Sequence, residues 1–159
     1  MRRRYTAADY RKIAEALRAA RPDLALTTDL IVGFPGESDA DFRETLALVR
    51  DCGFVDSFSF KYSPRPNTRA AEFAEAVDPA CAQDRLAELQ ELQRAQTLAY
   101  HRSRVGEEIE VRVEGPSRRG GPQLHGRDRF HRAVNFAAPA DAMPASGSRV
   151  RWRPTPTYC

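Results

Sequence analysis

The chain has few cysteines and no long apolar run. Its 159 residues include three cysteines, Cys52, Cys81 and Cys159, which are scattered and odd in number. They show neither a disulfide framework nor the spacing of a metal-ligand set. No apolar run approaches the roughly 20 residues of a membrane helix, and the opening Met-Arg-Arg-Arg-Tyr lacks the apolar core of a secretory signal. We therefore expect a cytoplasmic protein with no membrane partner.

Lysine is also scarce, and the charge is unevenly distributed. Lys12 and Lys61 are the two lysines, so arginine supplies nearly all of the positive charge. Residues 1–104 carry 16 basic and 16 acidic groups, whereas residues 105–159 carry 9 and 6, which places the net charge of +3 in the C-terminal third. Five arginines and one aspartate lie within residues 115–135. A basic patch of this kind favours contact with the phosphate backbone of a nucleic acid.

The stretch Thr27 to Ser38 predicts a strand, a tight turn and the start of a helix. Leu30, Ile31 and Val32 form a β-branched apolar run closed by glycine and proline, which is typical of a strand buried on both faces of a parallel sheet. Ser38 and Asp41 resemble a capping box for a helix that carries Phe42, Leu46 and Val49. Such turns lie at the carboxyl ends of parallel strands, where ligands bind and helix amides favour anionic or polar groups.

Helical and strand patterns flank this stretch. Thr6 to Asp9 is a cap for a helix whose apolar face includes Tyr10, Ile13, Ala14 and Leu17 and which ends before Pro22. Phe58, Phe60 and Tyr62 alternate with polar residues, which predicts a strand that ends at Pro64. Between Pro64 and Pro66, Arg65 is held in an extended turn that suits presentation of its guanidinium to a carboxylate or phosphate.

The second half of the sequence predicts a long helix and then short strands. Asp78-Pro79 starts a helix that nothing interrupts before about Arg104, and its leucine stripe is typical of a packing helix. From Gly106 onward, Ile109, Val111 and Val113 alternate with charges. A Pro/Gly/Arg loop is expected over 116–126, with further strands at 133–136 and near Val150 and Trp152. This pattern favours a small β-barrel, a fold that commonly binds RNA through a charged face.

Four strings carry a resemblance to a known family: Thr-Asp-Leu-Ile-Val-Gly-Phe-Pro-Gly-Glu-Ser, then Tyr-Ser-Pro-Arg-Pro-Asn-Thr, then Leu-His-Gly-Arg-Asp-Arg and Arg-Ala-Val-Asn-Phe. The chain resembles the C-terminal part of radical SAM methylthiotransferases of the MiaB type, which act on tRNA. The resemblance covers residues 1 to about 138 and fades beyond Pro139. It implies an α/β fold, with the last strands of a partial radical SAM barrel over 1–104 and a TRAM-like β-barrel, possibly incomplete at its end, over 105–159.

The resemblance also implies site residues. At the ends of the two strands it places cofactor-binding residues for S-adenosylmethionine (SAM): Asp29, Gly33, Phe34, Gly36, Tyr62, Ser63 and Arg65. In the basic patch it places contacts to the anticodon arm of tRNA: Arg118, Arg119, Arg127, Arg129 and Arg132. Asn67 stands where the family usually has glycine, and asparagine tolerates the left-handed backbone expected there.

The chemistry of the family requires groups that this sequence lacks. The complete enzymes use [4Fe–4S] clusters and SAM to convert N6-isopentenyladenosine-37 of tRNA to its 2-methylthio derivative. Their Cys-x-x-x-Cys-x-x-Cys loop does not occur here, so the chain is expected to contain no catalytic residue or metal ligand, to depend on the N-terminal domains of the same enzyme and to be inactive alone. Three alternatives remain: an RNA-binding module without catalysis, a truncated structural remnant, and a relative that acts on threonylcarbamoyladenosine in tRNA or on a ribosomal protein.

Overall fold

The computed structural model describes residues 4–118, 121–137 and 146–154, and the chain divides into two compact units. The first unit is Met1–Thr97 and the second is Leu98–Cys159. The division falls inside the long helix α3, seven residues before the boundary at 104/105 expected from the sequence. Each unit has its own buried apolar cluster. The units are therefore described separately.

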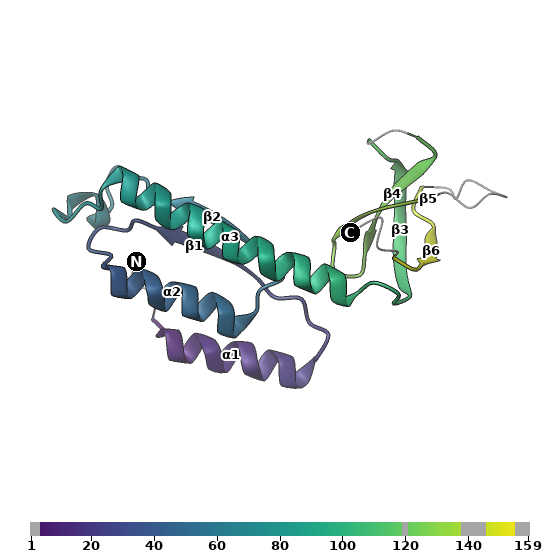
Figure 1. Cartoon of the computed structure of the whole chain (residues 1–159), viewed down its shortest axis with the longest axis horizontal. Coiled ribbons are helices and arrows are strands. Elements are labelled where there is room, and N and C mark those ends of the chain that lie inside the picture. The colour runs from purple at the N-terminus through teal and green to yellow at the C-terminus, as the bar shows by residue number, and fades with distance from the viewer. Residues whose placement is uncertain (1–3, 119–120, 138–145, 155–159) are drawn as a thin grey trace. The chain divides into compact units, whose positions relative to one another are not determined.

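The first unit alternates helices and strands. Its elements are α1 (Ala7–Ala20), β1 (Thr27–Val32), α2 (Asp39–Cys52), β2 (Asp56–Lys61), the short 3-10 helix η1 (Arg69–Glu72) and most of α3 (Pro79–Ser103). This order is the one that the sequence predicts, with η1 as an addition. Figure 1 shows α1 and α2 running side by side. The expected α/β class is confirmed, whereas closure into a barrel is not part of the described structure.

Both predicted capping boxes are present. The Thr6 side chain accepts a hydrogen bond from the Asp9 N–H, and the Thr6 N–H donates to Asp9 at 3.0 Å. Ser38 and Asp41 make the same reciprocal pair at the start of α2, where the Ser38 N–H donates to Asp41 at 2.9 Å. Each box satisfies amides that the first turn of a helix leaves without an intrahelical partner. Gly53 ends α2 in a left-handed conformation with a φ of 51°.

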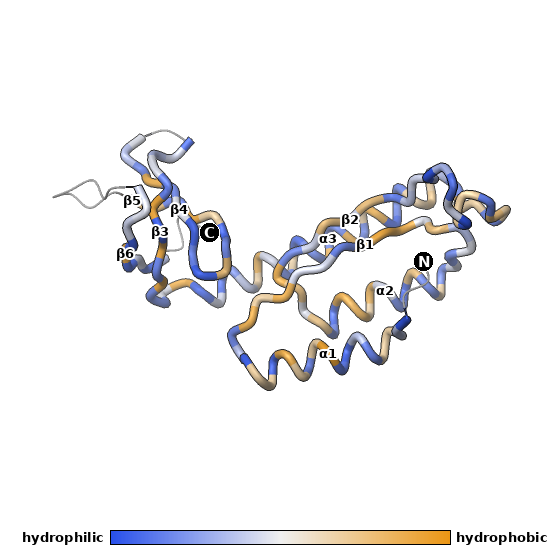
Figure 2. Tube along the Cα trace, turned by 180° about the vertical axis from the view of Figure 1, so that it is seen from behind, coloured by the Kyte–Doolittle hydropathy of each residue, from blue (hydrophilic) through white to orange (hydrophobic). Residues whose placement is uncertain are grey.

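The two strands of the first unit are parallel, as expected, but only one face of their sheet is covered. The register pairs Thr27 with Asp56 and Val32 with Lys61, so both strands end at the same edge. The face that carries Val32 packs against the helices. On the other face Phe58 and Phe60 are 70% and 54% exposed and Ile31 is also exposed. The prediction of a strand buried on both faces is therefore wrong, and Figure 2 shows hydrophobic residues along β1 and β2.

The core of the first unit lies between the covered sheet face and the three helices. Its buried members come from every one of these elements and from the connection after α2: Ala14, Val32, Phe42, Leu46, Val49, Cys52, Phe54 and Leu89. Full burial of one such valine, leucine or phenylalanine side chain contributes about 1.5–3 kcal/mol. The apolar face predicted for α1 is only partly covered, because Ile13 and Leu17 are exposed. Burial raises the pKa of the Cys52 thiol, so this cysteine is a core residue.

The second unit contains a four-stranded antiparallel sheet in the order β5-β4-β3-β6. Its strands are β3 (Ile109–Pro116), β4 (Gln123–Asp128), β5 (Ala133–Ala137) and β6 (Arg149–Trp152). Val111, Val113, Leu124 and Phe136 form its buried cluster. The loop predicted over 116–126 is shorter than expected, since residues 123–126 belong to β4. The structure bears out the small antiparallel sheet, and its closure into a barrel stays a prediction.

Candidate functional site

The two parallel strands of the first unit end beside each other and create the edge where the sequence places a ligand. The Tyr62 N–H donates to the Val32 carbonyl at 2.8 Å, which extends the pairing one residue beyond β2. Gly33 begins the turn after β1, and Ser63 follows Tyr62 after β2. The polypeptide thus brings the two predicted segments together at one edge, as the parallel register requires.

Three aromatic rings gather at this edge. The rings of Phe34 and Tyr62 meet edge to face with their centroids 5.1 Å apart. The ring centroid of Phe73, which follows η1, lies 6.3 Å from that of Phe34, and Phe73 remains about half exposed. The phenol oxygen of Tyr62 is buried without a hydrogen-bond partner among the described residues. Aromatic rings beside an unpaired hydroxyl suit a flat, polar ligand such as a nucleoside, because the rings supply stacking surface and the hydroxyl a hydrogen bond.

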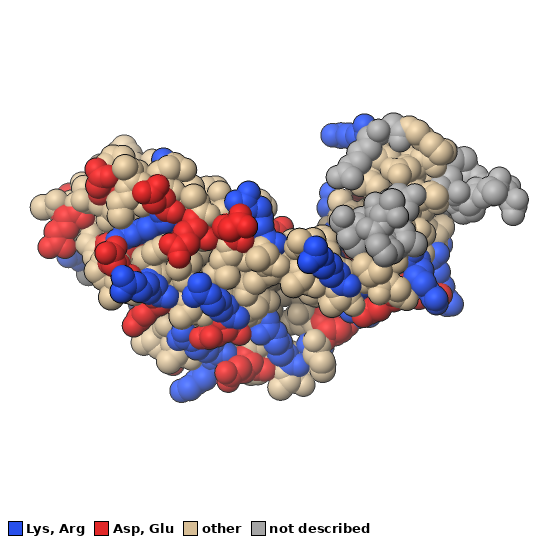
Figure 3. Space-filling model, in the orientation of Figure 1, with Lys and Arg blue, Asp and Glu red and all other residues tan. Residues whose placement is uncertain are grey.

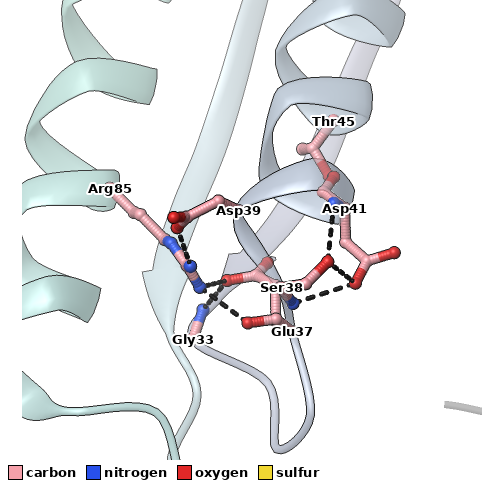
Figure 4. A network of polar contacts seen from close by, with 7 residues as sticks. All are labelled: Gly33, Glu37, Ser38, Asp39, Asp41, Thr45 and Arg85. Carbon is pink, nitrogen blue, oxygen red and sulfur yellow. Dashed lines mark hydrogen bonds and ion pairs between the residues drawn. The ribbon is translucent and has the colours of Figure 1, made fainter.

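An ion-pair network centred on the buried side chains of Arg85 and Glu37 holds the turn between β1 and α2. We call the contacts among Gly33, Glu37, Asp39 and Arg85 the Arg85 network (Figure 4). Arg85 of α3 donates to the Glu37 carboxylate at 2.8 Å, to the Glu37 carbonyl at 3.0 Å and to the Asp39 carboxylate at 2.6 Å. The Glu37 carboxylate also accepts from the Gly33 N–H at 2.7 Å. The hydrogen bond and charge of Arg85 lower the pKa of Asp39, and Asp39 in turn raises the pKa of Arg85.

The glycines of this turn serve the fold in a way the sequence does not indicate. Gly33 and Gly36 have left-handed φ angles of 70° and 82°. Their N–H groups donate to Glu37 and to the Glu75 carbonyl, so both amides are engaged within the protein. The start of α2 also carries the carboxylates of Asp39 and Asp41, whose charge opposes an anion. The expectation that these backbone groups attract an anionic ligand therefore finds little support in the geometry.

The other predicted cofactor-binding residues differ in their distance from the edge where the two strands end. Asp29 is on the exposed sheet face beside Phe58 and three residues before the end of β1, which is about 10 Å along the strand. Ser63 and Arg65 are exposed beyond the end of β2. The Arg65 carbonyl accepts a hydrogen bond from the Thr68 hydroxyl at 2.8 Å, and Asn67 adopts the expected left-handed backbone with a φ of 63°.

Sequence reasoning missed Arg85, Glu37 and Phe73 as members of this site. A pattern for Arg85 exists in the sequence, because residues 82, 85, 89 and 93 are spaced as one helix face and all four are buried. An arginine within such a face indicates a buried partner. Glu37 and Phe73 have no comparable pattern. The partners of Glu37 depend on how α3 packs against the turn, and the contact of Phe73 with Phe34 depends on how the segment 64–78 folds back.

In the second unit, Arg132 is part of a turn that is organised around the buried carboxylate of Asp128. The Asp128 carboxylate accepts from the N–H groups of Phe130 and Arg132 at 2.9 and 3.0 Å and from the Arg132 Nε at 2.8 Å. The Arg132 guanidinium also lies 4.9 Å from the ring centroids of Phe130 and Tyr100. Arg132 therefore stabilises the turn between β4 and β5, in addition to any contact with RNA.

The remaining predicted RNA contacts differ in their surroundings. Arg118 is exposed, and Arg129 is exposed with its guanidinium 4.7 Å from the Phe130 ring centroid. Arg127 lies on β4 rather than in a loop, and it pairs with Glu114 at 3.2 Å. Arg119 lies outside the described residues. Figure 3 shows acidic side chains among the basic ones over the helices of the first unit.

The part of the chain that the structure describes holds no group of three or more His, Cys, Asp or Glu side chains placed to bind a metal ion. Within the same residues, no helix is long and apolar enough to cross a membrane. The ligand set of an iron–sulfur cluster is therefore not found in these residues, whereas the aromatic edge and the orphaned Tyr62 hydroxyl fit a nucleoside.

Comparison with known proteins identifies relatives, although no family model matches the chain. The chain is 48% identical over 147 residues to a tRNA-2-methylthio-N(6)-dimethylallyladenosine synthase of Maricaulis maris, which is 92% of this chain and 32% of that protein. Proteins of the same name from Ralstonia nicotianae and Vibrio cholerae are 47% and 44% identical over 87% and 90% of the chain. The chain thus spans about a third of the length of these curated relatives.

Proposed function

We propose that this chain, whose resemblance to the tRNA-2-methylthio-N(6)-dimethylallyladenosine synthases is confirmed by these relatives, is the C-terminal part of such an enzyme. The observation that carries the proposal is identity of 44–48% along about nine-tenths of the chain. The proposed reaction converts N6-isopentenyladenosine-37 of tRNA to its 2-methylthio derivative. SAM and [4Fe–4S] clusters held by the rest of the enzyme would supply the methyl group, the sulfur atom and the radical chemistry.

The contribution of this chain is to bind and orient. The aromatic edge formed by Phe34 and Tyr62 contacts SAM, and the Tyr62 hydroxyl donates or accepts the hydrogen bond that it lacks within the protein. Asp29 accepts hydrogen bonds from SAM on the exposed sheet face, and Arg65 binds a carboxylate or phosphate beyond β2. Gly33 and Gly36 shape the turn that places Phe34, and Ser63 lines the edge.

The exposed apolar face of the β1–β2 sheet is an argument that these strands belong to a larger sheet in the complete enzyme. Ile31, Phe58 and Phe60 form an apolar surface on two strands, and soluble proteins seldom leave such a surface uncovered. Parallel strands usually occur in sheets covered on both faces. We therefore place β1 and β2 as the last strands of the partial radical SAM barrel, with this face turned to its interior.

A fusion with a relative tests the proposal. In the Maricaulis fusion, this chain replaces the homologous third of the Maricaulis maris protein, and the assay detects 2-methylthio nucleosides in digested tRNA. We expect the fusion to form the product and the isolated chain to form none. Asp29→Ala or Arg65→Ala in the fusion is expected to weaken SAM affinity about tenfold, because each removes a hydrogen bond to a charged group.

Two results would contradict the proposal. One is a fusion that folds and holds its clusters but forms no product. The other is unchanged SAM affinity in both variants, which would remove Asp29 and Arg65 from the site. A product with threonylcarbamoyladenosine tRNA in place of isopentenylated tRNA would instead favour the alternative inside the family.

The second unit is proposed to hold the anticodon arm of tRNA. Arg118 and Arg129 are exposed on the segments around β4, and Arg127, Arg132 and Arg119 complete the basic group. Phosphate contacts make affinity fall with salt, and loss of one contact lowers the slope of log K against log salt by about 1. We expect this change for Arg118→Gln and no change for Arg94→Gln on α3.

A further inference from the structure

Arg85 is buried on a helix whose other arginines are at the surface. Its side chain is 8% exposed, whereas that of Arg94, nine residues later on α3, is 71% exposed. Two of its hydrogen bonds go to Glu37 in the turn between β1 and α2, and a third goes to Asp39 at the start of α2, as Figure 4 shows. The guanidinium also lies 5.6 Å from the ring centroid of Phe42. Arg85 thus connects α3 with the turn and with the first helical residue after it.

Glu37 carries this connection to the end of β1. Its carboxylate is 9% exposed, and the same Oε2 that accepts from Arg85 accepts from the Gly33 N–H. On the preceding turn of α3, Ala82 lies against Gly33 so closely that a Cβ built on Gly33 would be 2.8 Å from the Ala82 Cβ. One face of α3 therefore determines where the turn begins and where it ends.

The energetics of a buried ion pair indicate that Arg85 fixes the orientation of the turn more than it stabilises the fold. Removing two charges from water is costly, and apolar side chains of similar volume often stabilise a fold as well or better. An apolar pair, however, does not fix the orientation of backbone groups. A planar guanidinium with several donors in a rigid fork does, because it binds two carboxylates and a carbonyl only in one arrangement.

We propose that Arg85 is a positioning residue, which fixes the turn Gly33–Glu37 so that Phe34 packs against Tyr62 and thereby sets the affinity of this edge for SAM. The identity of the ligand rests on the proposed function. The conformation of the turn does not, because it follows from contacts within the first unit. Arg85 touches no part of the expected ligand in this account and acts through Glu37 and the backbone.

Amide hydrogen exchange in the 159-residue chain tests the positioning role. We compare the exchange rates of the Gly33 and Val49 amides in the original chain, in Arg85→Lys and in Arg94→Lys. Lysine keeps the charge, but its single ammonium cannot reach both carboxylates and the Glu37 carbonyl together. Arg85→Lys is expected to speed exchange at Gly33 about tenfold relative to Val49 in the core of α2. Arg94→Lys, which changes a surface pair on the same helix, is expected to leave this ratio unchanged.

A milder variant covers the case in which Arg85→Lys does not fold. Asp39→Asn removes the charge of a carboxylate that is 75% exposed and leaves the buried Glu37 pair in place. It is expected to raise the Gly33 exchange rate about twofold to threefold. The positioning role is overturned when the ratio of Gly33 to Val49 exchange stays constant, or when both amides change together as they would after a general loss of stability.

SAM binding to the Maricaulis fusion tests the link to the ligand. Arg85→Lys is expected to raise the dissociation constant for SAM about tenfold and to leave the KM for tRNA unchanged. Faster exchange at Gly33 with unchanged SAM affinity would overturn this link. A fusion with the original Arg85 that binds no SAM would instead reject the proposed function, and the exchange experiment would still decide whether Arg85 positions the turn.

Discussion

Gly33 is subject to two separate requirements at one residue. Its φ of 70° is a conformation that costs an L-residue about 1–2 kcal/mol. Its missing side chain also leaves the space that Ala82 of α3 occupies. Gly36, three residues later, shares the first requirement but not the second, because a Cβ there would meet only the flexible end of Glu75 at 3.0 Å.

The pair of glycines gives a direct prediction. Gly33→Ala is expected to lower the free energy of unfolding by about 2–4 kcal/mol, because the backbone cost adds to the cost of overpacking against Ala82. Gly36→Ala is the matched control and is expected to cost about 1–2 kcal/mol. Urea unfolding followed by circular dichroism measures both. Equal losses in the two variants would show that the contact with Ala82 contributes nothing.

Gly33 also shows which part of the site the sequence could predict. The Gly-Phe-Pro-Gly string predicts a turn, and the positive φ angles of both glycines agree with it. The sequence interpretation placed both glycines among the residues that bind SAM. In the structure the close neighbour of Gly33 is Ala82, almost 50 residues later, and no local pattern predicts which residue of a later helix will face a turn.

At the scale of elements, local chemistry predicted the ends of the helices well. Ser38 and Asp41 mark the start of α2, and hydrogen bonds from the Ser38 hydroxyl and N–H lower the pKa of Asp41. Because the pKa is lower in the folded state, this capping box stabilises the protein above the unfolded pKa of about 3.8. The contribution disappears as the pH falls through the folded pKa.

The capping box of α2 can be tested by substitution and by acid. Ser38→Ala is expected to cost about 1 kcal/mol at pH 7, and the difference from the original chain is expected to shrink below about pH 4. Thr45→Ala serves as the control, since the Thr45 hydroxyl donates within the helix to the Asp41 carbonyl and takes no part in the cap. Urea unfolding at pH 7 and pH 3 provides both values. A loss for Ser38→Ala that is the same at both pH values would contradict this account.

Burial of the strands was harder to predict than their position. The run Leu30-Ile31-Val32 has the composition of a strand covered on both sides, yet Ile31 is exposed because the described structure has helices on one face only. The apolar composition of a strand predicts that both of its faces are buried. It does not predict which segment of the polypeptide packs against each face. The length of the loop before β4 was overestimated for a different reason. The sequence interpretation placed Gly126 in this loop, but it lies inside β4, where its missing Cβ lets the backbone of Arg112 approach.

On the scale of the whole molecule, the chain has two cores that share no residue. Val32, Val49 and Leu89 belong to the first, and Val113 and Leu124 to the second. The turn around Asp128 stabilises only the second, where its side chain is 3% exposed and pairs with Arg132. A substitution in one unit is therefore expected to act on the stability of that unit.

Asp128→Asn tests this independence. Removal of one partner of a buried ion pair costs about 3–5 kcal/mol, so exchange at the amides of Val113 and Leu124 is expected to accelerate strongly. Exchange at Val49 is expected to stay as it is. Gly33→Ala is expected to give the reverse pattern. Acceleration in both units after either substitution would show that they unfold as one.

The spacing of Ala82 and Arg85 on α3 determines where this protein tolerates changes in length. The two residues face the same turn because they are three apart on one helix, and each residue adds about 100° of rotation. One residue inserted between them would direct the methyl group and the guanidinium to different sides of the helix. In the exposed segment from Pro64 to Asp78, extra residues would leave both contacts in register. Over evolution, insertions and deletions should therefore gather before α3 and be excluded from its first two turns.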